Sequence, residues 1–197
     1  MLSFLPSTNV SLFWLINSHH NVFFDCFFSI VTNLGNGWVV TPVLLTIVII
    51  KVPRQKLALF IASATFFMVG SGLINTQIKQ SFNRPRPLTF FAKETGYGSN
   101  EQRSVHAVGE RLYWNSFPSG HSNTAFAAAT MVALRFGGVF WLAYVVACLT
   151  GYSRIYMGTH FPSDVAAGAF LGVIIMWIWS KIYLWYDCRR TNKNDKK

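Results

Sequence analysis

The chain has 197 residues, of which 52% are hydrophobic and only 12% are charged, and its mean hydropathy is +0.34. This composition is typical of integral membrane proteins and is more apolar than a soluble core of this size needs. The net charge of +10 does not indicate nucleic-acid binding, because the basic residues stand at the ends of apolar runs. We therefore predict a protein that lies in the lipid bilayer and has no nucleic-acid partner.

The first segment is the weakest candidate for a membrane span. The apolar run from Val10 to Val31 is interrupted by Asn17, Ser18, His19, His20, Asn21 and Asp25. Residues 1–32 are expected to form either a weak first span or an interfacial helix with Leu12, Phe13, Leu15 and Ile16 facing lipid. The absence of basic residues before this run argues against a cleaved signal peptide.

Five later apolar runs approach the length that a bilayer requires. They cover roughly residues 33–50, 57–78, 119–134, 139–157 and 162–183. No internal repeat or long linker divides the chain. We predict a single membrane domain over residues 1–197, an all-α polytopic helical bundle with five to six transmembrane helices.

Basic residues are concentrated at alternate ends of these runs. They lie in segment 51–56, at Arg135 and in the tail 186–197, which the positive-inside rule assigns to the cytoplasm. The loop 82–117 and the turn 158–163 then lie on the extracytoplasmic face. Three polar motifs fall on this face, where we expect the active site.

The first motif is "KQSFNRPRP". It places Lys79 at the end of a helix and Arg84 and Arg86 just beyond it, each before a proline that discourages helical structure. Lys79 and Arg86 are candidates for phosphate binding, and Arg84 is a candidate for additional attraction of phosphate.

The second motif, "FPSGHS", predicts the N-terminus of a helix. Ser119 and Gly120 would lie near the first turn, where unpaired backbone N–H groups and the helix dipole favour an anion. Gly120 allows close approach of the anion to the backbone. His121 would lie within reach of that anion.

The third motif, "GYSRIYMGTHFPSD", contains Arg154, His160 and Asp164. Because His160 and Asp164 are four residues apart, we expect them on one helix face. The carboxylate could then fix the imidazole tautomer and leave the other ring nitrogen free to attack. Lys79, Arg86 and Arg154 would surround the same point, and guanidinium groups match phosphoryl oxygens well.

Together the motifs predict a metal-independent phosphoryl-transfer site. Cations and helix N–H groups would stabilise the phosphoryl oxygens, while one histidine attacks phosphorus and a second protonates the leaving oxygen. The seven acidic residues are scattered, so we expect no magnesium site and no cofactor. Cys26, Cys148 and Cys188 lack metal-ligand spacing and are expected to be buried free thiols.

Each motif alone also has a structural explanation. Lys79 could be a helix-end lysine that reaches the membrane surface, "PSGH" an ordinary capped turn, and His160 with Asp164 a structural hydrogen bond. Their joint occurrence on one expected face favours the functional interpretation.

The same residues give the chain a family resemblance. It resembles the type 2 phosphatidic acid phosphatase superfamily, whose signature is Lys-x6-Arg-Pro, Pro-Ser-Gly-His and Ser-Arg-x5-His-x3-Asp. The corresponding stretches are Lys79–Pro87, Pro118–His121 and Ser153–Asp164, with no departure at a signature position. The signature is shared with vanadate-dependent haloperoxidases, which are soluble.

The resemblance implies a role for each matching residue. Lys79, Arg86, Ser119, Gly120 and Arg154 would bind phosphate, whereas Ser153 and Pro87 would serve architecture. His160 would form a phosphohistidine, His121 would act as general acid, and Asp164 would orient His160. Water would then hydrolyse the intermediate.

Similarity to small bacterial family members implies a lipid phosphate or pyrophosphate phosphatase. The substrate would be an isoprenyl pyrophosphate, phosphatidylglycerol phosphate, phosphatidic acid or a lipid A phosphate. The protein would lie in a bacterial inner or plasma membrane, with its active site facing the periplasm or the cell exterior. The alternatives are a lipid phosphotransferase that moves phosphate between lipids, and a non-catalytic lipid-binding or transport protein. The oligomeric state stays open.

Overall fold

The computed structural model describes residues 6–94 and 104–194. In these two ranges every regular element is a helix, which confirms the all-α prediction. The elements are α1 (Ser7–Asn17), α2 (Val22–Val31), η1 (Thr32–Gly35), α3 (Gly37–Lys51), α4 (Arg54–Phe82), α5 (Pro87–Glu94), α6 (Gly120–Phe136), η2 (Gly138–Leu142), α7 (Ala143–Tyr156) and α8 (Pro162–Asn194).

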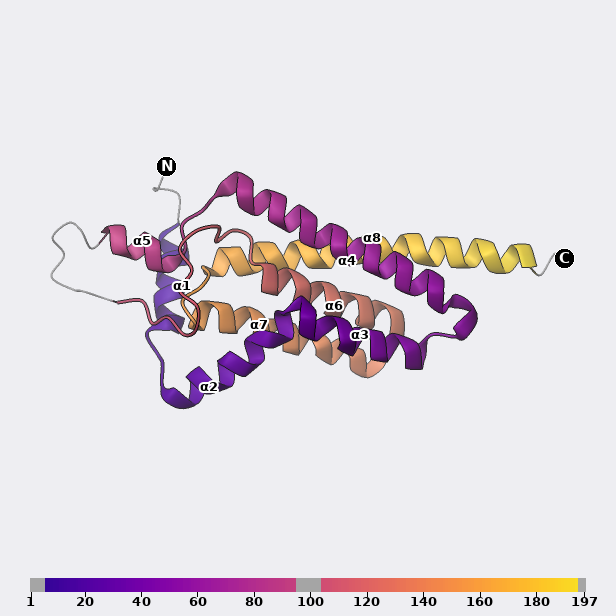
Figure 1. Ribbon diagram of the computed structural model, residues 1–197, viewed down its shortest axis with the longest axis horizontal. Helices are drawn as coiled ribbons and strands as arrows, with labels where there is room; N and C mark the ends of the chain where they lie inside the picture. The colour runs from indigo at the N-terminus through magenta and orange to yellow at the C-terminus, as the bar shows by residue number, and fades with distance from the viewer. Residues whose placement is uncertain (1–5, 95–103, 195–197) are drawn as a thin grey trace.

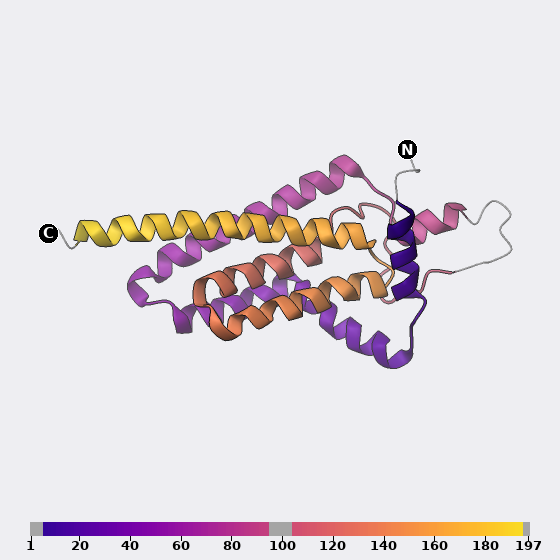
Figure 2. The ribbon, with the colours of Figure 1, turned by 180° about the vertical axis from the view of Figure 1, so that it is seen from behind.

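The long helices run along the length of an elongated bundle, and α1 crosses one end of it (Figures 1 and 2). The short helix α5 lies at that same end, and the C-terminus lies at the other. Helix α6 is central, since it packs against α3, α4, α7 and α8. Its buried positions are rich in alanine, which allows these neighbours to approach closely. They include Ala125, Ala127, Ala128, Ala129 and Ala133.

Two glycines bring α6 and α8 into backbone contact. A Cβ atom on Gly168 would collide with the carbonyl oxygen of Ser119, and one on Gly172 would collide with that of Asn123. These glycines have the G-x-x-x-G spacing that lets membrane helices pack closely. Their packing fixes the start of α6 against the start of α8, and so joins the second and third motifs.

Replacing Gly168 with leucine should destabilise the bundle. The added side chain would meet backbone atoms that cannot move aside, so we expect a loss of about 2 kcal/mol or more in the free energy of unfolding. Thermal unfolding in detergent, followed by circular dichroism, measures this loss. The matched control is Ala166→Leu, because Ala166 is exposed on the same helix. Equal melting temperatures for the two variants would contradict the packing argument.

The N-terminal quarter departs from the expected elements. The run 10–31 is broken between α1 and α2, and the next helix begins at Gly37, where the side chain of Asn36 accepts a hydrogen bond from the N–H of Trp38. The expectation that Phe13 faces lipid is wrong, because this ring is fully buried with Phe91 and Phe161. Helix α1 therefore packs on the bundle through an aromatic cluster.

The number of transmembrane helices stays a prediction. By length and hydropathy, three segments of the described chain could cross a membrane: 54–92, 138–156 and 162–190. A fourth candidate is the pair formed by residues 22–35 and 37–51, which is bent by 62°. Helix α6, counted as a span from its sequence, has 17 residues and is largely enclosed by its neighbours. Many large apolar side chains face outward, as lipid contact requires.

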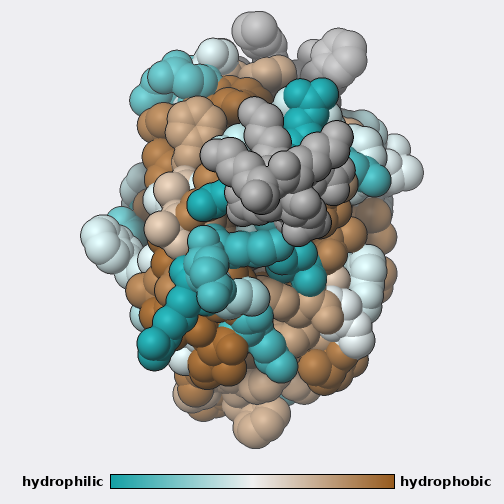
Figure 3. Space-filling model, turned by 90° about the vertical axis from the view of Figure 1, so that its right-hand side faces the viewer, coloured by the Kyte–Doolittle hydropathy of each residue, from teal (hydrophilic) through white to brown (hydrophobic). Residues whose placement is uncertain are grey.

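The basic segments gather at the end of the bundle that lies opposite α1. Lys56 forms a 2.7 Å ion pair with Asp187, and the guanidinium of Arg135 lies 5.2 Å from the centroid of the Tyr183 ring. Figure 3 looks onto this end and shows hydrophilic residues gathered on it. The chain thus has one basic end and one end that carries the three motifs.

Helix α8 continues to Asn194 and so includes most of the segment 186–197 that is expected to be a cytoplasmic tail. The expectation for the cysteines is corrected. Cys26, Cys148 and Cys188 are free thiols, but they are exposed on the helices rather than buried.

Candidate active site

The three sequence motifs meet at the end of the bundle that α1 crosses (Figures 1 and 2). The first motif ends α4 and runs into α5, the second begins α6, and the third ends α7 and begins α8. All eight residues predicted for the site lie in this region: Lys79, Arg86, Ser119, Gly120, His121, Arg154, His160 and Asp164.

The N-terminus of α6 forms one wall of the site. Ser119 is its N-cap, with extended backbone angles, and its hydroxyl oxygen accepts a hydrogen bond from the N–H of Ser122. A Cβ atom on Gly120 would lie 3.9 Å from Nζ of Lys79, so this amine faces the first residue of the helix. The structure confirms the predicted helix start and places a cation beside backbone N–H groups that favour anions.

Two buried guanidinium groups form a second wall. Arg86 and Arg154 are each only 7% exposed. Arg86 donates to the backbone oxygens of Trp114 and Thr159, at 2.9 and 3.2 Å. Arg154 donates to the hydroxyl of Thr32 at 2.7 Å, and its Nε has no hydrogen-bond partner among the described residues. Within the described parts of the chain neither group forms an ion pair. Buried positive charges that are not paired directly with a carboxylate favour binding of an anion.

His160 is held in a turn between α7 and α8. Gly158 has a φ of +68°, and the N–H of His160 donates to the carbonyl oxygen of Arg154 at 3.2 Å. The imidazole is 2% exposed, and its Nε2 lies 3.4 Å from Nη1 of Arg86. One ring nitrogen therefore faces the guanidinium wall, where an anion would bind.

Burial is the main influence on the protonation of His160. It lowers the pKa of the imidazole to about 3 from an ordinary 6.5, because the charged form loses hydration. The positive charges of Arg86 and Arg154 act in the same direction, whereas Asp164 raises the pKa. The ring is therefore neutral near pH 7, as a nucleophile must be. His121, the second residue of α6, is half-buried near the positive charges of Arg154, Lys79 and Arg86.

Asp164 lies beside His160, but not on a shared helix face as expected. Helix α8 begins at Pro162, so His160 precedes it. The carboxylate of Asp164 reaches back to accept from the N–H of Phe161 at 2.9 Å, as the third residue of a capping box does. Because the Asp164 side chain points back toward the start of α8, its Oδ2 lies 3.7 Å from Nδ1 of His160. The Nδ1 atom has no hydrogen-bond partner in the described residues.

Arg84 contacts the carboxylate of Asp164 instead of facing the anion site. Its Nη1 donates to Oδ1 of Asp164 at 2.6 Å, and it also reaches the hydroxyl of Ser163 at 3.1 Å. Additional attraction of phosphate by Arg84 stays a prediction. Arg84 neutralises the buried carboxylate and holds it in place.

Three contacts at the site lack any signal in the sequence. The hydroxyl of Ser116 donates to Asp164 at 2.5 Å. Thr32 binds Arg154, as described above, from a turn outside the three motifs. In the same turn, a Cβ on Gly35 would lie 2.8 Å from the carbonyl oxygen of His121, so the turn packs directly on the start of α6. Only the tertiary fold brings these residues to the site.

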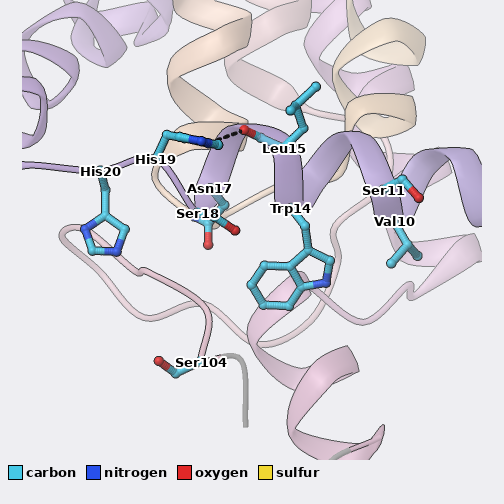
Figure 4. Close-up of a pocket in the computed structure, with 9 residues that line it drawn as sticks. All are labelled: Val10, Ser11, Trp14, Leu15, Asn17, Ser18, His19, His20 and Ser104. Carbon is cyan, nitrogen blue, oxygen red and sulfur yellow. Dashed lines mark hydrogen bonds between the residues drawn. The ribbon is translucent and has the colours of Figure 1, made fainter. Parts of the chain in front are cut away.

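A second histidine cluster lies at the same end of the bundle. The Nε2 atom of His106 lies 2.8 Å from Oδ1 of Asp25, and the His106 ring stacks on that of His20 with 3.7 Å between the ring centroids. A neighbouring cavity of about 670 Å³ is shown in Figure 4, where His19 turns back to the carbonyl oxygen of Leu15. Its lining is Val10, Ser11, Trp14, Leu15, Asn17, Ser18, His19, His20 and Ser104. This cavity includes none of the eight predicted site residues.

Comparison with known proteins connects this geometry to a family. A family model described as the PAP2 superfamily matches residues 58–187. The crystal structure of LpxE from Aquifex aeolicus is similar with a TM-score of 0.73 and 31% sequence identity, covering 92% of this chain and 99% of that one.

Curated relatives also match along most of the chain. A lipid A 4'-phosphatase of Porphyromonas gingivalis is 26% identical over 95% of this chain and 78% of its own length. An undecaprenyl-diphosphatase of Bacillus subtilis is 25% identical over 80% of this chain and 74% of its own. Two further relatives match only locally, at 46% and 42% identity, over 15% and 35% of their own length.

Proposed function

The chain belongs to the PAP2 superfamily, and on this premise we propose that it is a metal-independent phosphatase for a membrane lipid carrying a phosphate or pyrophosphate group. The observation that carries the proposal is the pair of buried guanidinium groups, Arg86 and Arg154, beside a buried and neutral His160. A phosphoryl group would supply the negative charge that these cations lack, and its phosphorus would lie next to a nucleophile.

The proposed reaction has two steps. In the first, Nε2 of His160 attacks phosphorus, the bond from phosphorus to the lipid oxygen breaks, and His121 gives its proton to that oxygen. Arg86, Arg154 and Lys79, with the N–H groups at Gly120, stabilise the phosphoryl oxygens. In the second, water attacks the phosphohistidine and gives a proton to His121. The phosphorus–nitrogen bond then breaks and inorganic phosphate leaves.

Ser119 and Asp164 support these groups. Ser119 caps the helix that presents the N–H groups, and Asp164 stabilises the positive charge that develops on His160. The separation of 3.7 Å between Asp164 and His160 would shorten when the ring becomes charged. The fixed cations take the electrostatic role that magnesium has in other phosphoryl-transfer enzymes.

The substrate is proposed to be a lipid A phosphate or an isoprenyl pyrophosphate, because relatives over most of the chain are named for these two classes. Phosphatidylglycerol phosphate and phosphatidic acid are further candidates. The bundle has the motifs at one end and basic residues at the other, so we propose that the site opens to the periplasm or cell exterior of a bacterial inner membrane.

The direct test is phosphate release by the purified protein in detergent with EDTA. The panel contains lipid A, undecaprenyl pyrophosphate, phosphatidylglycerol phosphate and phosphatidic acid. We expect release from at least one lipid in EDTA, and none from the His160→Ala protein. Lipid labelled with ³²P separates the two enzymatic outcomes, because a phosphatase yields free phosphate and a phosphotransferase yields a second labelled lipid. Activity that requires added metal would refute the metal-independent mechanism.

The pH dependence should reflect the lowered pKa of His160. With a pKa of about 3, its attacking neutral form is fully present above about pH 4 and is lost only as pH falls through 3. We therefore expect kcat/KM to show no acid limb from His160 between pH 5 and 8. The second ionisation of the substrate phosphate, at about pH 6, is measured separately, and the rate profile is corrected for it. A residual acid limb near pH 6.5 would contradict the burial of His160.

A further inference from the structure

Asn75 is a buried polar residue of α4 that no motif includes. It is 4% exposed and lies four residues before Lys79, so the two side chains share a helix face. Its Oδ1 atom is buried and has no hydrogen-bond partner in the described residues. A buried amide oxygen without a partner loses hydration and gains nothing in return. The side-chain amide of Asn75 therefore lacks a hydrogen bond that a buried acceptor needs.

The other end of this amide faces the N-terminus of α6. A Cβ atom on Gly120 would lie 3.7 Å from Nδ2 of Asn75 and 3.9 Å from Nζ of Lys79. Both nitrogen atoms thus converge on the first residue of the helix, where backbone N–H groups and the helix dipole favour an anion.

A neighbouring pair shows how a purely structural contact between α4 and α6 is made. One turn before Asn75, the hydroxyl of Ser71 donates to Oδ1 of Asn123 on α6 at 2.9 Å, and both residues are buried. In that pair, the protein itself supplies the acceptor for the Ser71 hydroxyl. Asn75 lies on the same helix and also faces α6, but its Nδ2 is directed at Gly120. Its Oδ1 remains without a hydrogen-bond partner in the described residues.

We propose that Asn75 is a further substrate-binding residue, whose Nδ2 donates a hydrogen bond to an oxygen of the phosphoryl group held between Gly120 and Lys79. With the ligand bound, its Oδ1 accepts from the Lys79 ammonium, which is drawn to the same anion. The amide thereby binds the anion and orients the cation. This inference rests on the proposed function for the identity of its ligand, but the recognition concerns any tetrahedral oxyanion.

The first test measures binding of inorganic phosphate and of orthovanadate without turnover. The dissociation constants are obtained from thermal stabilisation of the wild-type protein, Asn75→Asp and Asn75→Leu. We expect Asn75→Asp to weaken binding at least tenfold, because a carboxylate of the same shape repels the anion, and Asn75→Leu to weaken it about fivefold. Ser71→Ala is the control, since it breaks the contact between α4 and α6 away from Gly120 and should leave the dissociation constants unchanged.

The outcomes separate this inference from the proposed function. Wild-type affinity in Asn75→Asp, or no oxyanion binding by the wild-type protein, overturns the role of Asn75. Weakened binding in a protein that hydrolyses no lipid of the panel would support this role while the proposed function fails. If lipid is hydrolysed, KM should rise more than kcat falls in Asn75→Leu. Equal weakening by Ser71→Ala would show a general packing defect and would also overturn the inference.

Discussion

Phosphate release should fall by about 10³-fold or more when His160 is replaced with alanine. The substitution removes the nucleophile of the proposed mechanism, and loss of a nucleophile leaves only the contribution of binding and electrostatic stabilisation. The cavity that remains is still lined by Arg86 and Arg154, so the oxyanion should still bind. The measurement is single-turnover release from the best lipid of the panel, with thermal unfolding as the check on folding.

His121 provides the matched control, because the mechanism gives the two histidines different roles. His121→Ala should also lower the rate on a lipid phosphate, but the rate should recover on an aryl phosphate whose nitrophenolate leaves without protonation. His160→Ala should stay inactive on both substrates. Equal recovery in the two variants, or full activity of His160→Ala, would exclude His160 as the nucleophile.

The ends of the site helices could be predicted from local sequence. Ser119 caps α6 as expected, since the serine, glycine and polar residues of this stretch are themselves the signal for a helix start. The clustering of Lys79, Arg86 and Arg154 could be predicted because all three lie near the ends of apolar runs on the same expected face of the membrane. These features depend on residues close together in the chain, which a pattern can capture.

The contacts that hold the site together could not be predicted in this way. His160 and Asp164 meet through a capping turn before α8, not through a helix repeat. Gly168 and Gly172 read as ordinary members of an apolar run, and only the facing backbone of α6 shows why a side chain would not fit. Thr32 reaches Arg154 across 122 positions of sequence. A single sequence contains no record of such pairings.

Arg84 illustrates how such a pairing changes the interpretation of a residue. Its place beside Arg86 in the first motif indicated phosphate attraction, but its Nη1 binds Oδ1 of Asp164 at 2.6 Å. The same segment is fixed a second time, since the N–H of Ser116 donates to the carbonyl oxygen of Arg84 and the hydroxyl of Ser116 donates to Asp164. Asp164 is fully buried, so these donors decide the position of its charge. Arg84 would thus act on the nucleophile through Asp164.

Replacing Arg84 with leucine should therefore lower kcat about 10- to 100-fold and leave KM nearly unchanged, because the carboxylate that orients His160 loses its main support. Arg84→Lys should recover part of the rate. In an Asp164→Asn protein, adding Arg84→Leu should lower kcat only slightly further, since the two residues act as one unit. Steady-state kinetics on the best lipid measures both constants, and Arg111→Leu is the control for loss of an exposed cation. A rise in KM at constant kcat would instead restore the interpretation of Arg84 as a phosphate ligand.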